Sequence, residues 1–155
     1  MKVYLAGETP MSKDEGWSRD VEGWQRGALS AIIKRRLYSF YYHDRIDKEV
    51  QTAIDAKMEL FLDSGAFSAH TQGDEIKIEE YAQFIKEHGH HFTVKANLDD
   101  IGDTGPKSWA NYLWLKEHKC DVFPVHHASD EDRYIEMMIE ELQPTNGFMA
   151  LGGLV

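Results

Sequence analysis

The sequence predicts an α/β fold in which the strands of a parallel sheet alternate with helices. Six short runs of β-branched, aromatic or other apolar residues are distributed along the 155 residues, and amphipathic stretches separate them. The alternation has a period of roughly 25–35 residues, which is typical of βα units. A doubly wound sheet and a (β/α) barrel both fit this pattern. The turn after the first run contains neither GxGxxG nor GxxxxGKS/T, which disfavours a nucleotide-binding doubly wound sheet.

The predicted strands are short, because each apolar run is bounded by turn-forming residues. They lie at Val3–Ala6, Leu37–Tyr42, Leu60–Leu62, Phe92–Ala96, Val122–Val125 and Phe148–Leu151. Apolar residues at helical spacing predict helices between them, over 20–35, 46–54, 78–88, 106–116 and 129–142. Gly89 and Pro144 each end a predicted helix, and Pro106 suits the first turn of another.

The composition indicates a single domain, residues 1–155, that is acidic overall. The 27 acidic side chains outnumber the 17 basic ones and give a formal net charge of −10, which argues against gripping a nucleic acid through bulk charge. Basic surface is expected only locally, around Lys34-Arg35-Arg36. No apolar run approaches the roughly 18 residues of a membrane-spanning helix. The single cysteine, Cys120, excludes an intrachain disulfide and a Cys-rich zinc site, so we expect a cytoplasmic protein with no membrane partner.

Polar residues gather directly after four of the predicted strands. Because the carboxyl ends of parallel strands meet at one edge of a sheet or one rim of a barrel, active sites are commonly built there. We therefore expect the functional site at this rim. The segments concerned are Asp63-Ser64-Gly65-Ala66-Phe67, Asn97-Leu98-Asp99-Asp100, Val125-His126-His127 and Leu151-Gly152-Gly153.

Carboxylates and imidazoles at these strand ends are the candidates for proton transfer. Asp63 is the strongest, because it precedes a Ser-Gly turn with nearby backbone N–H groups; the alternative is an ordinary turn aspartate. Of the neighbours Asp99 and Asp100, one is expected to face the site, where two carboxylates in different environments can divide donor and acceptor roles. His126 and His127 point to opposite faces of their strand, so one is expected to hydrogen-bond in the pocket and the other to pack.

These segments resemble the tRNA-guanine transglycosylases. Asp63-Ser64-Gly65-Ala66-Phe67 is similar to the family's DSGGF segment, and Ala150-Leu151-Gly152-Gly153-Leu154 is similar to its IGGL segment. Asp99 falls between them, where the family has an aspartate at a strand end. The similarity spans about residues 59–155. It is closest to the DpdA-like proteins of phages and bacterial DNA-modification clusters, which are implicated in placing 7-deazaguanine bases in DNA.

The resemblance implies base exchange on a nucleic acid, DNA rather than tRNA, in a bacterium or a phage-infected host. In that chemistry a carboxylate attacks the sugar C1′, guanine leaves, and a 7-deazaguanine takes its place through a covalent intermediate. The resemblance implies that Asp63 is catalytic and handles the base or its proton, and that Asp99 accepts hydrogen bonds from the guanine-like edge. It implies a base pocket completed by Ser64, Gly65, Phe67, His126, Gly152 and Gly153, the last two through backbone contacts to the base carbonyl.

The resemblance also implies a TIM-type (β/α) barrel that is incomplete in this sequence, with about six of the eight strands. The family's nucleophilic aspartate and its zinc site follow the IGGL segment, whereas this sequence ends at Val155. We therefore expect no cofactor in this chain. We expect the active site to be completed by a C-terminal part, by a complementary barrel subunit or by an oligomer.

Two other functions remain open from the residues alone. Asp63, Asp99 and His126 could serve as ligands of Zn²⁺ or Mn²⁺ in a metal-dependent hydrolase, since carboxylate and imidazole suit these ions. Alternatively, the same pocket could hold a purine-like base without chemistry. In that case Gly152-Gly153 would still allow the backbone to approach a flat ligand closely.

Overall fold

The computed structural model describes residues 34–145 and 147–152 of the chain. The predicted strand at Val3–Ala6 and most of the predicted helix over 20–35 lie outside these residues. At the end of that range the structure differs from the prediction, because Arg35 already belongs to a strand. Among the described residues, no helix combines the length and the apolar character that crossing a bilayer would need.

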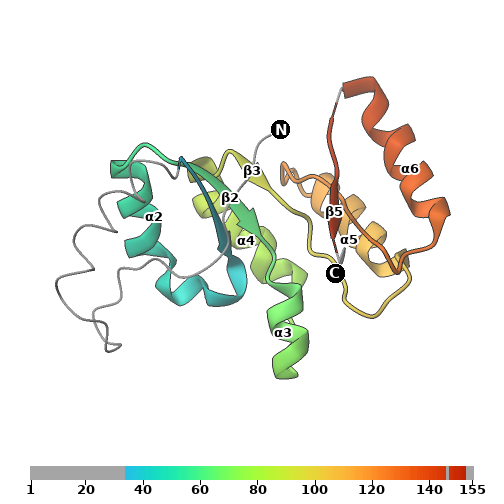
Figure 1. Cartoon of the computed structure of the whole chain (residues 1–155), viewed down its shortest axis with the longest axis horizontal. Helices are drawn as coiled ribbons and strands as arrows, with labels where there is room; N and C mark the ends of the chain where they lie inside the picture. Colours follow the sequence, from blue (N-terminus) through green and yellow to red (C-terminus); the bar gives the residue numbers. More distant parts are fainter. Residues whose placement is uncertain (1–33, 146, 153–155) are drawn as a thin grey trace.

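Strands and helices alternate along the described chain (Figure 1). The strands are β1 Arg35–Ser39, β2 Glu59–Asp63, β3 Val94–Lys95, β4 Val125–His127 and β5 Ala150–Gly152. The α-helices are α2 Ile46–Asp55, α3 Ala66–Gln72, α4 Ile78–His88, α5 Pro106–Glu117 and α6 Asp132–Leu142. Short 3₁₀ segments lie at η1 Phe40–Arg45, η2 Gly89–His91 and η3 Gln143–Thr145.

Every described strand pairs with its neighbour in the sequence, and every pairing is parallel. β1, β2 and β3 form one sheet in that order, and β4 pairs with β5. A parallel bridge between Ala96 and Phe123 connects the two groups. A doubly wound sheet contains a point at which the strand order reverses, and the described strands contain no such reversal. The order is the one a (β/α) barrel has, but these strands do not close on themselves, so the barrel stays a prediction.

The register brings the carboxyl ends of the strands level with one another. Ser39 at the end of β1 lies opposite Asp63 at the end of β2. In the two-stranded sheet, His127 at the end of β4 lies opposite Gly152 at the end of β5. Chemistry-bearing residues from distant parts of the sequence therefore share one rim.

The two faces of the sheet bury different sets of side chains, since successive residues of a strand point to opposite faces. Leu60 and Leu62 are fully buried in the larger core, which lies under the helices. Phe61, between them, belongs to a smaller apolar cluster with Phe123, whose ring stacks on it at 5.6 Å. The larger core therefore packs between the sheet and the helices, and the smaller cluster lies on the face that carries Phe61.

The first described strand is shorter and earlier than the predicted strand Leu37–Tyr42. The chain turns into η1 at Phe40, whose ring centroid lies 5.0 Å from that of Tyr81 and 5.2 Å from that of Phe84. Packing on α4 therefore decides where the strand ends. The predicted strand Val122–Val125 is also displaced, because only its last residue belongs to β4.

Helix α3 has no counterpart among the predicted elements. Its seven residues span only two turns of about 3.6 residues each, too few for a periodic apolar stripe. Two glycines in the left-handed region delimit it, Gly65 with φ of 79° and Gly73 with φ of 77°. The helix projects from the carboxyl end of β2, beside the rim (Figure 1).

Candidate functional site

Asp99 is the centre of a hydrogen-bonded cluster built by consecutive strand ends. The Ser64 hydroxyl, just after β2, donates to Asp99 Oδ1 at 2.6 Å. His127 Nε2, at the end of β4, lies 2.8 Å from Asp99 Oδ2. The side chains of Asp99 and His127 are only 11% and 14% exposed, so these charge-assisted contacts are largely shielded from water. The carboxylate is thereby fixed from both sides.

Asp63 lies beside this cluster and is the carboxyl group most perturbed by it. The backbone N–H of Gly65 donates to Asp63 Oδ2 at 2.9 Å. Burial, and secondly the negative charge of Asp99, raise the pKa of Asp63 to about 6, although Gly65 and His127 act in the opposite direction. A carboxyl group with a pKa close to neutrality can both give and take a proton at physiological pH. The predicted catalytic residue therefore has the properties of an acid–base group.

The raised pKa predicts that Asp63 makes the protein less stable as the pH rises. Between its usual pKa of 3.8 and about 6, the folded state binds more protons than the unfolded state, so the free energy of unfolding falls across this window. We expect Asp63→Asn to gain about 2 kcal/mol relative to the wild type when the pH is raised from 4 to 7. Urea unfolding at both pH values measures this. A difference between the two proteins that does not change with pH would contradict the assignment.

His127 is the basic partner of Asp99 in the site. Its hydrogen bond to Asp99 raises the pKa of His127, burial lowers it, and the carboxylates of Asp99, Asp130 and Asp63 raise it further. The backbone N–H of His127 donates to Asp130 Oδ2 at 2.7 Å, and the Asp130 N–H donates to the His127 carbonyl at 2.9 Å. This reciprocal pair fixes the backbone at the end of β4, so that the imidazole meets Asp99.

The structure brings together Asp63, Ser64 and Asp99 of the predicted site, and places the other members differently. His126 is buried on the outer side of β4, where Nδ1 lies 3.7 Å from Asp130 Oδ2 and has no hydrogen-bond partner. Phe67, on α3, is 68% exposed. Gly65 forms the turn that leads into α3, and Gly152 lies against the His127 ring. Gly153 lies outside the described residues.

His127 and Asn97 are among the polar strand-end residues of the sequence, but the sequence assigns neither of them a role in the site. The sequence predicts that one of two adjacent histidines faces the site, but periodicity alone cannot say which. Asn97 is fully buried; its amide donates to the Ser108 carbonyl at 2.9 Å, and its Oδ1 accepts from the Val125 N–H at 3.0 Å. It therefore joins the end of β3 to β4 and to α5. In the sequence, the feature that could have indicated Asn97 is its position as an asparagine directly after an apolar run.

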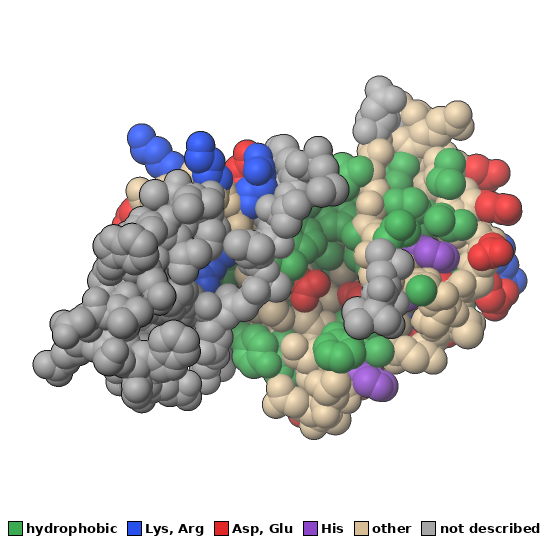
Figure 2. Space-filling model, in the orientation of Figure 1, with side chains coloured by type: hydrophobic (Ala, Val, Ile, Leu, Met, Phe, Trp, Pro, Cys, Tyr) green, Lys and Arg blue, Asp and Glu red, His purple; other side chains and the backbone are tan. Residues whose placement is uncertain are grey.

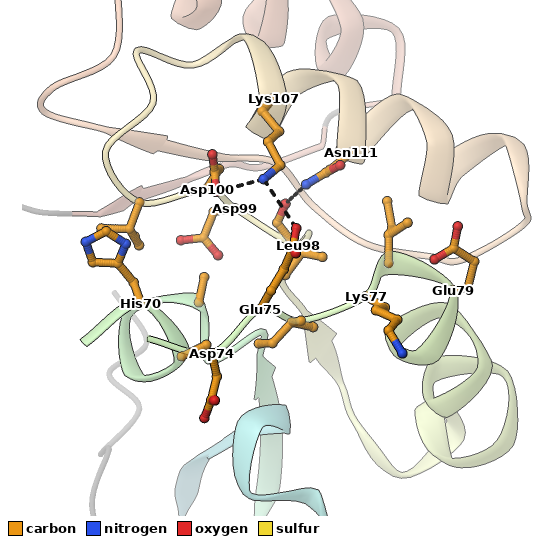
Figure 3. Close-up of a pocket in the computed structure, with 15 residues that line it drawn as sticks. His70, Asp74, Glu75, Lys77, Glu79, Leu98, Asp99, Asp100, Lys107 and Asn111 are labelled. Carbon is orange, nitrogen blue, oxygen red and sulfur yellow. Dashed lines mark hydrogen bonds and ion pairs between the residues drawn. The ribbon is translucent and has the colours of Figure 1, made fainter. Parts of the chain in front are cut away.

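A pocket of about 290 Å³ opens beside Asp99, between α3, the start of α4 and the loop after β3 (Figure 3). Asp100 turns to this side, where the Lys107 ammonium lies 3.3 Å from its Oδ1 and 4.0 Å from Glu75 Oε1. Asn111 donates to the Leu98 carbonyl at 2.9 Å and holds the same loop. Asp99 and Asp100 therefore have different surroundings. This agrees with the expectation that only one of the two faces the site.

The basic run at the start of β1 lies at the opposite end of the strands from this rim. Arg35 pairs with Glu59 at 2.9 Å, and Arg36 is 9% exposed with its guanidinium 5.4 Å from the centre of the Tyr38 ring. In Figure 2, Lys and Arg side chains gather mainly at the end of the molecule that holds β1 and α2, and acidic side chains gather along α6. Pairing reduces the basic surface at Arg35 and burial reduces it at Arg36, whereas Lys34 is exposed.

The metal-ligand set of the hydrolase hypothesis is not assembled, because His127 rather than His126 meets Asp99. Within residues 34–145 and 147–152, no three His, Cys, Asp or Glu side chains are grouped so that they could hold a metal ion. No family model, no curated protein and no solved structure matches this chain. Its function is therefore inferred from the residues and the site alone.

Proposed function

We propose that this chain binds a guanine-like base at the carboxyl ends of its strands and takes part in base exchange on a nucleic acid. The observation that carries the proposal is the cluster of Asp63, Ser64, Asp99 and His127, which come from three successive strand ends. Asp63 and Asp99 are the two carboxylates that the resemblance to tRNA-guanine transglycosylases assigns to the base. The cluster supports that assignment, because a sequence similarity alone would not require the two carboxylates to lie close enough for the charge of Asp99 to act on Asp63.

Asp99 has the chemistry that recognises a guanine edge. Guanine presents two parallel donors there, the ring N1–H and the exocyclic N2–H, and a carboxylate accepts such a pair through its two oxygens. In this structure Ser64 donates to Asp99 Oδ1 and the His127 imidazole contacts Oδ2. Burial strengthens such contacts, since the competing hydrogen bonds to water are removed.

Asp63 supplies the proton balance of the exchange. When a nucleophilic carboxylate attacks C1′, the C1′–N9 bond breaks and its electron pair stays on guanine N9, which takes a proton from the protonated Asp63. The incoming 7-deazaguanine then loses the proton of its corresponding nitrogen to the Asp63 carboxylate, bonds to C1′ and expels the nucleophile. A pKa of about 6 suits both directions. The resemblance assigns the nucleophile to a strand after Gly152-Gly153, and no described residue is proposed for it.

The nucleic-acid partner is DNA in preference to tRNA, in the cytoplasm of a bacterium or of a phage-infected host. Because its net charge is −10, we expect this chain to make few contacts with phosphates. A weak dependence of nucleic-acid binding on salt is therefore expected, because the number of released counterions follows the number of neutralised phosphates. Base-specific contacts, rather than the backbone, would provide most of the affinity.

Two measurements test the proposal. Calorimetric titration should show that the chain binds guanine and 7-deazaguanine but not adenine, which lacks the N1–H donor. Combined with the part that supplies the nucleophile, the chain should incorporate radiolabelled guanine into DNA. Binding without incorporation into DNA or tRNA would indicate a base-binding module instead of an exchange enzyme. Equal affinity for guanine and adenine would contradict the role of Asp99.

A further inference from the structure

The ring of His127 lies between the two groups that are proposed to hold the base. On one side, Nε2 is 2.8 Å from Asp99 Oδ2. On the other side, a Cβ placed on Gly152 would be 3.1 Å from Nε2, 3.3 Å from Cε1 and 3.4 Å from Cδ2. The His127 ring therefore lies where a side chain on Gly152 would point, between Gly152 and Asp99.

The imidazole also has the chemical features of the expected ligand. It is flat and aromatic, and it carries an N–H in the plane of the ring. Its contact with Asp99 is of the same type as the contact that guanine N1–H would make with that carboxylate. His127 thus makes the hydrogen bond to Asp99 that a bound base would make.

We propose that His127 occupies the base subsite in this state, and that a flat heteroaromatic base with an N–H edge binds by displacing the imidazole from Asp99. This inference rests on the proposed function and deepens it, because it makes His127 the competitor that an incoming base must replace. A ligand without an in-plane N–H cannot replace the hydrogen bond that Asp99 loses when the imidazole leaves, and such a ligand is therefore rejected.

The displacement needs only a side-chain rotation. The His127 backbone is fixed by Asp130 at 2.7 Å and by the bond from Ala128 N to the Gly152 carbonyl at 3.2 Å. Ser64 keeps its bond to the other oxygen of Asp99, so the carboxylate stays oriented while the imidazole leaves. The site is therefore prepared for the base once the ring has turned away.

Calorimetric titration with guanine tests the inference on the wild type, His127→Ala and the matched control His90→Ala. His90 lies in η2, before β3, and is exposed. Since hydrogen bonds to charged groups are the stronger ones, we expect His127→Ala to bind guanine at least about tenfold more tightly than the wild type. His90→Ala should bind like the wild type. Millimolar imidazole should compete with guanine for His127→Ala and have no such effect on the wild type.

The outcomes separate this inference from the proposed function. Unchanged or weaker guanine binding by a folded His127→Ala would overturn the inference while the base site stands. No guanine binding by any of the three proteins would overturn the proposed function, and the inference with it. If His127→Ala fails to fold, an NMR measurement on the wild type still tests the inference. The ¹⁵N resonance of His127 Nε2 should shift when guanine saturates the protein, and an unshifted resonance would overturn the displacement.

Discussion

Asp99→Asn is expected to weaken guanine binding about a hundredfold. The substitution removes the negative charge and replaces one acceptor oxygen with an NH₂ donor, which would face the donors of the base. It also places that donor next to the Ser64 hydroxyl or His127 Nε2, both of which now bond to the carboxylate. Two charge-assisted contacts to the base are lost together, which is why the effect exceeds that of an ordinary hydrogen bond.

The matched control is Asp100→Asn, at the adjacent residue. Asp100 turns toward Lys107 at 3.3 Å on the pocket side, and its side chain is 32% exposed. The same chemical change there should alter guanine affinity less than about threefold, since an exposed ion pair contributes little. Calorimetry on both variants measures the difference. Similar losses for the two variants would mean that overall charge, and not the Asp99 contact, governs binding.

Gly65→Ala is expected to destabilise the protein by about 4 kcal/mol. Gly65 has φ of +79°, a conformation that costs an L side chain about 1 kcal/mol. In addition, a Cβ there would lie 2.5 Å from Tyr41 Cβ and 2.8 Å from the Tyr41 backbone nitrogen, and would overlap the Ser39 hydroxyl. The backbone of η1 cannot yield as a flexible side chain would, so β2 and η1 must separate.

Gly73→Ala separates conformational strain from steric overlap. Gly73 has nearly the same φ, +77°, at the other end of α3, but a Cβ there would meet no atom within 4 Å. Only the conformational cost of about 1 kcal/mol should remain. Urea unfolding of the two variants gives both values. If Gly65→Ala cost no more than Gly73→Ala, the tight packing of the Asp63-Ser64-Gly65 turn against η1 would be disproved.

The α/β alternation could be predicted because it depends on local patterns that survive in the structure. The helical stripe of α4 buries Tyr81, Phe84 and Ile85 in the larger core, so its spacing in the sequence is also its spacing in the core. Helix α3 was not predictable in this way, since its boundaries are set by the positive φ of Gly65 and Gly73 and not by apolar spacing.

The candidate site was predictable in position but not in detail. Parallel strands bring their carboxyl ends to one rim, so Asp63 and Asp99 were expected there. The choice of His127 over His126 depends on the residue at which β4 begins, and the strand prediction placed the run Val122–Val125 earlier than the structure does. The role of Asn97 depends on its contacts with Ser108 and Val125, which lie 11 and 28 residues away and leave no local pattern.

The sequential strand order has a consequence for how the chain acquires its structure. Each described strand pairs with the one just before it, directly or through the Ala96–Phe123 bridge. Each strand and helix that leaves the ribosome can therefore dock on a partner that has already emerged, and no described strand must wait for a later one. Folding can advance from β1 toward β5 during synthesis, with short loop closures at every step. On this route the rim is completed last, after β4 has brought His127 to Asp99 and β5 has placed Gly152 beside the His127 ring.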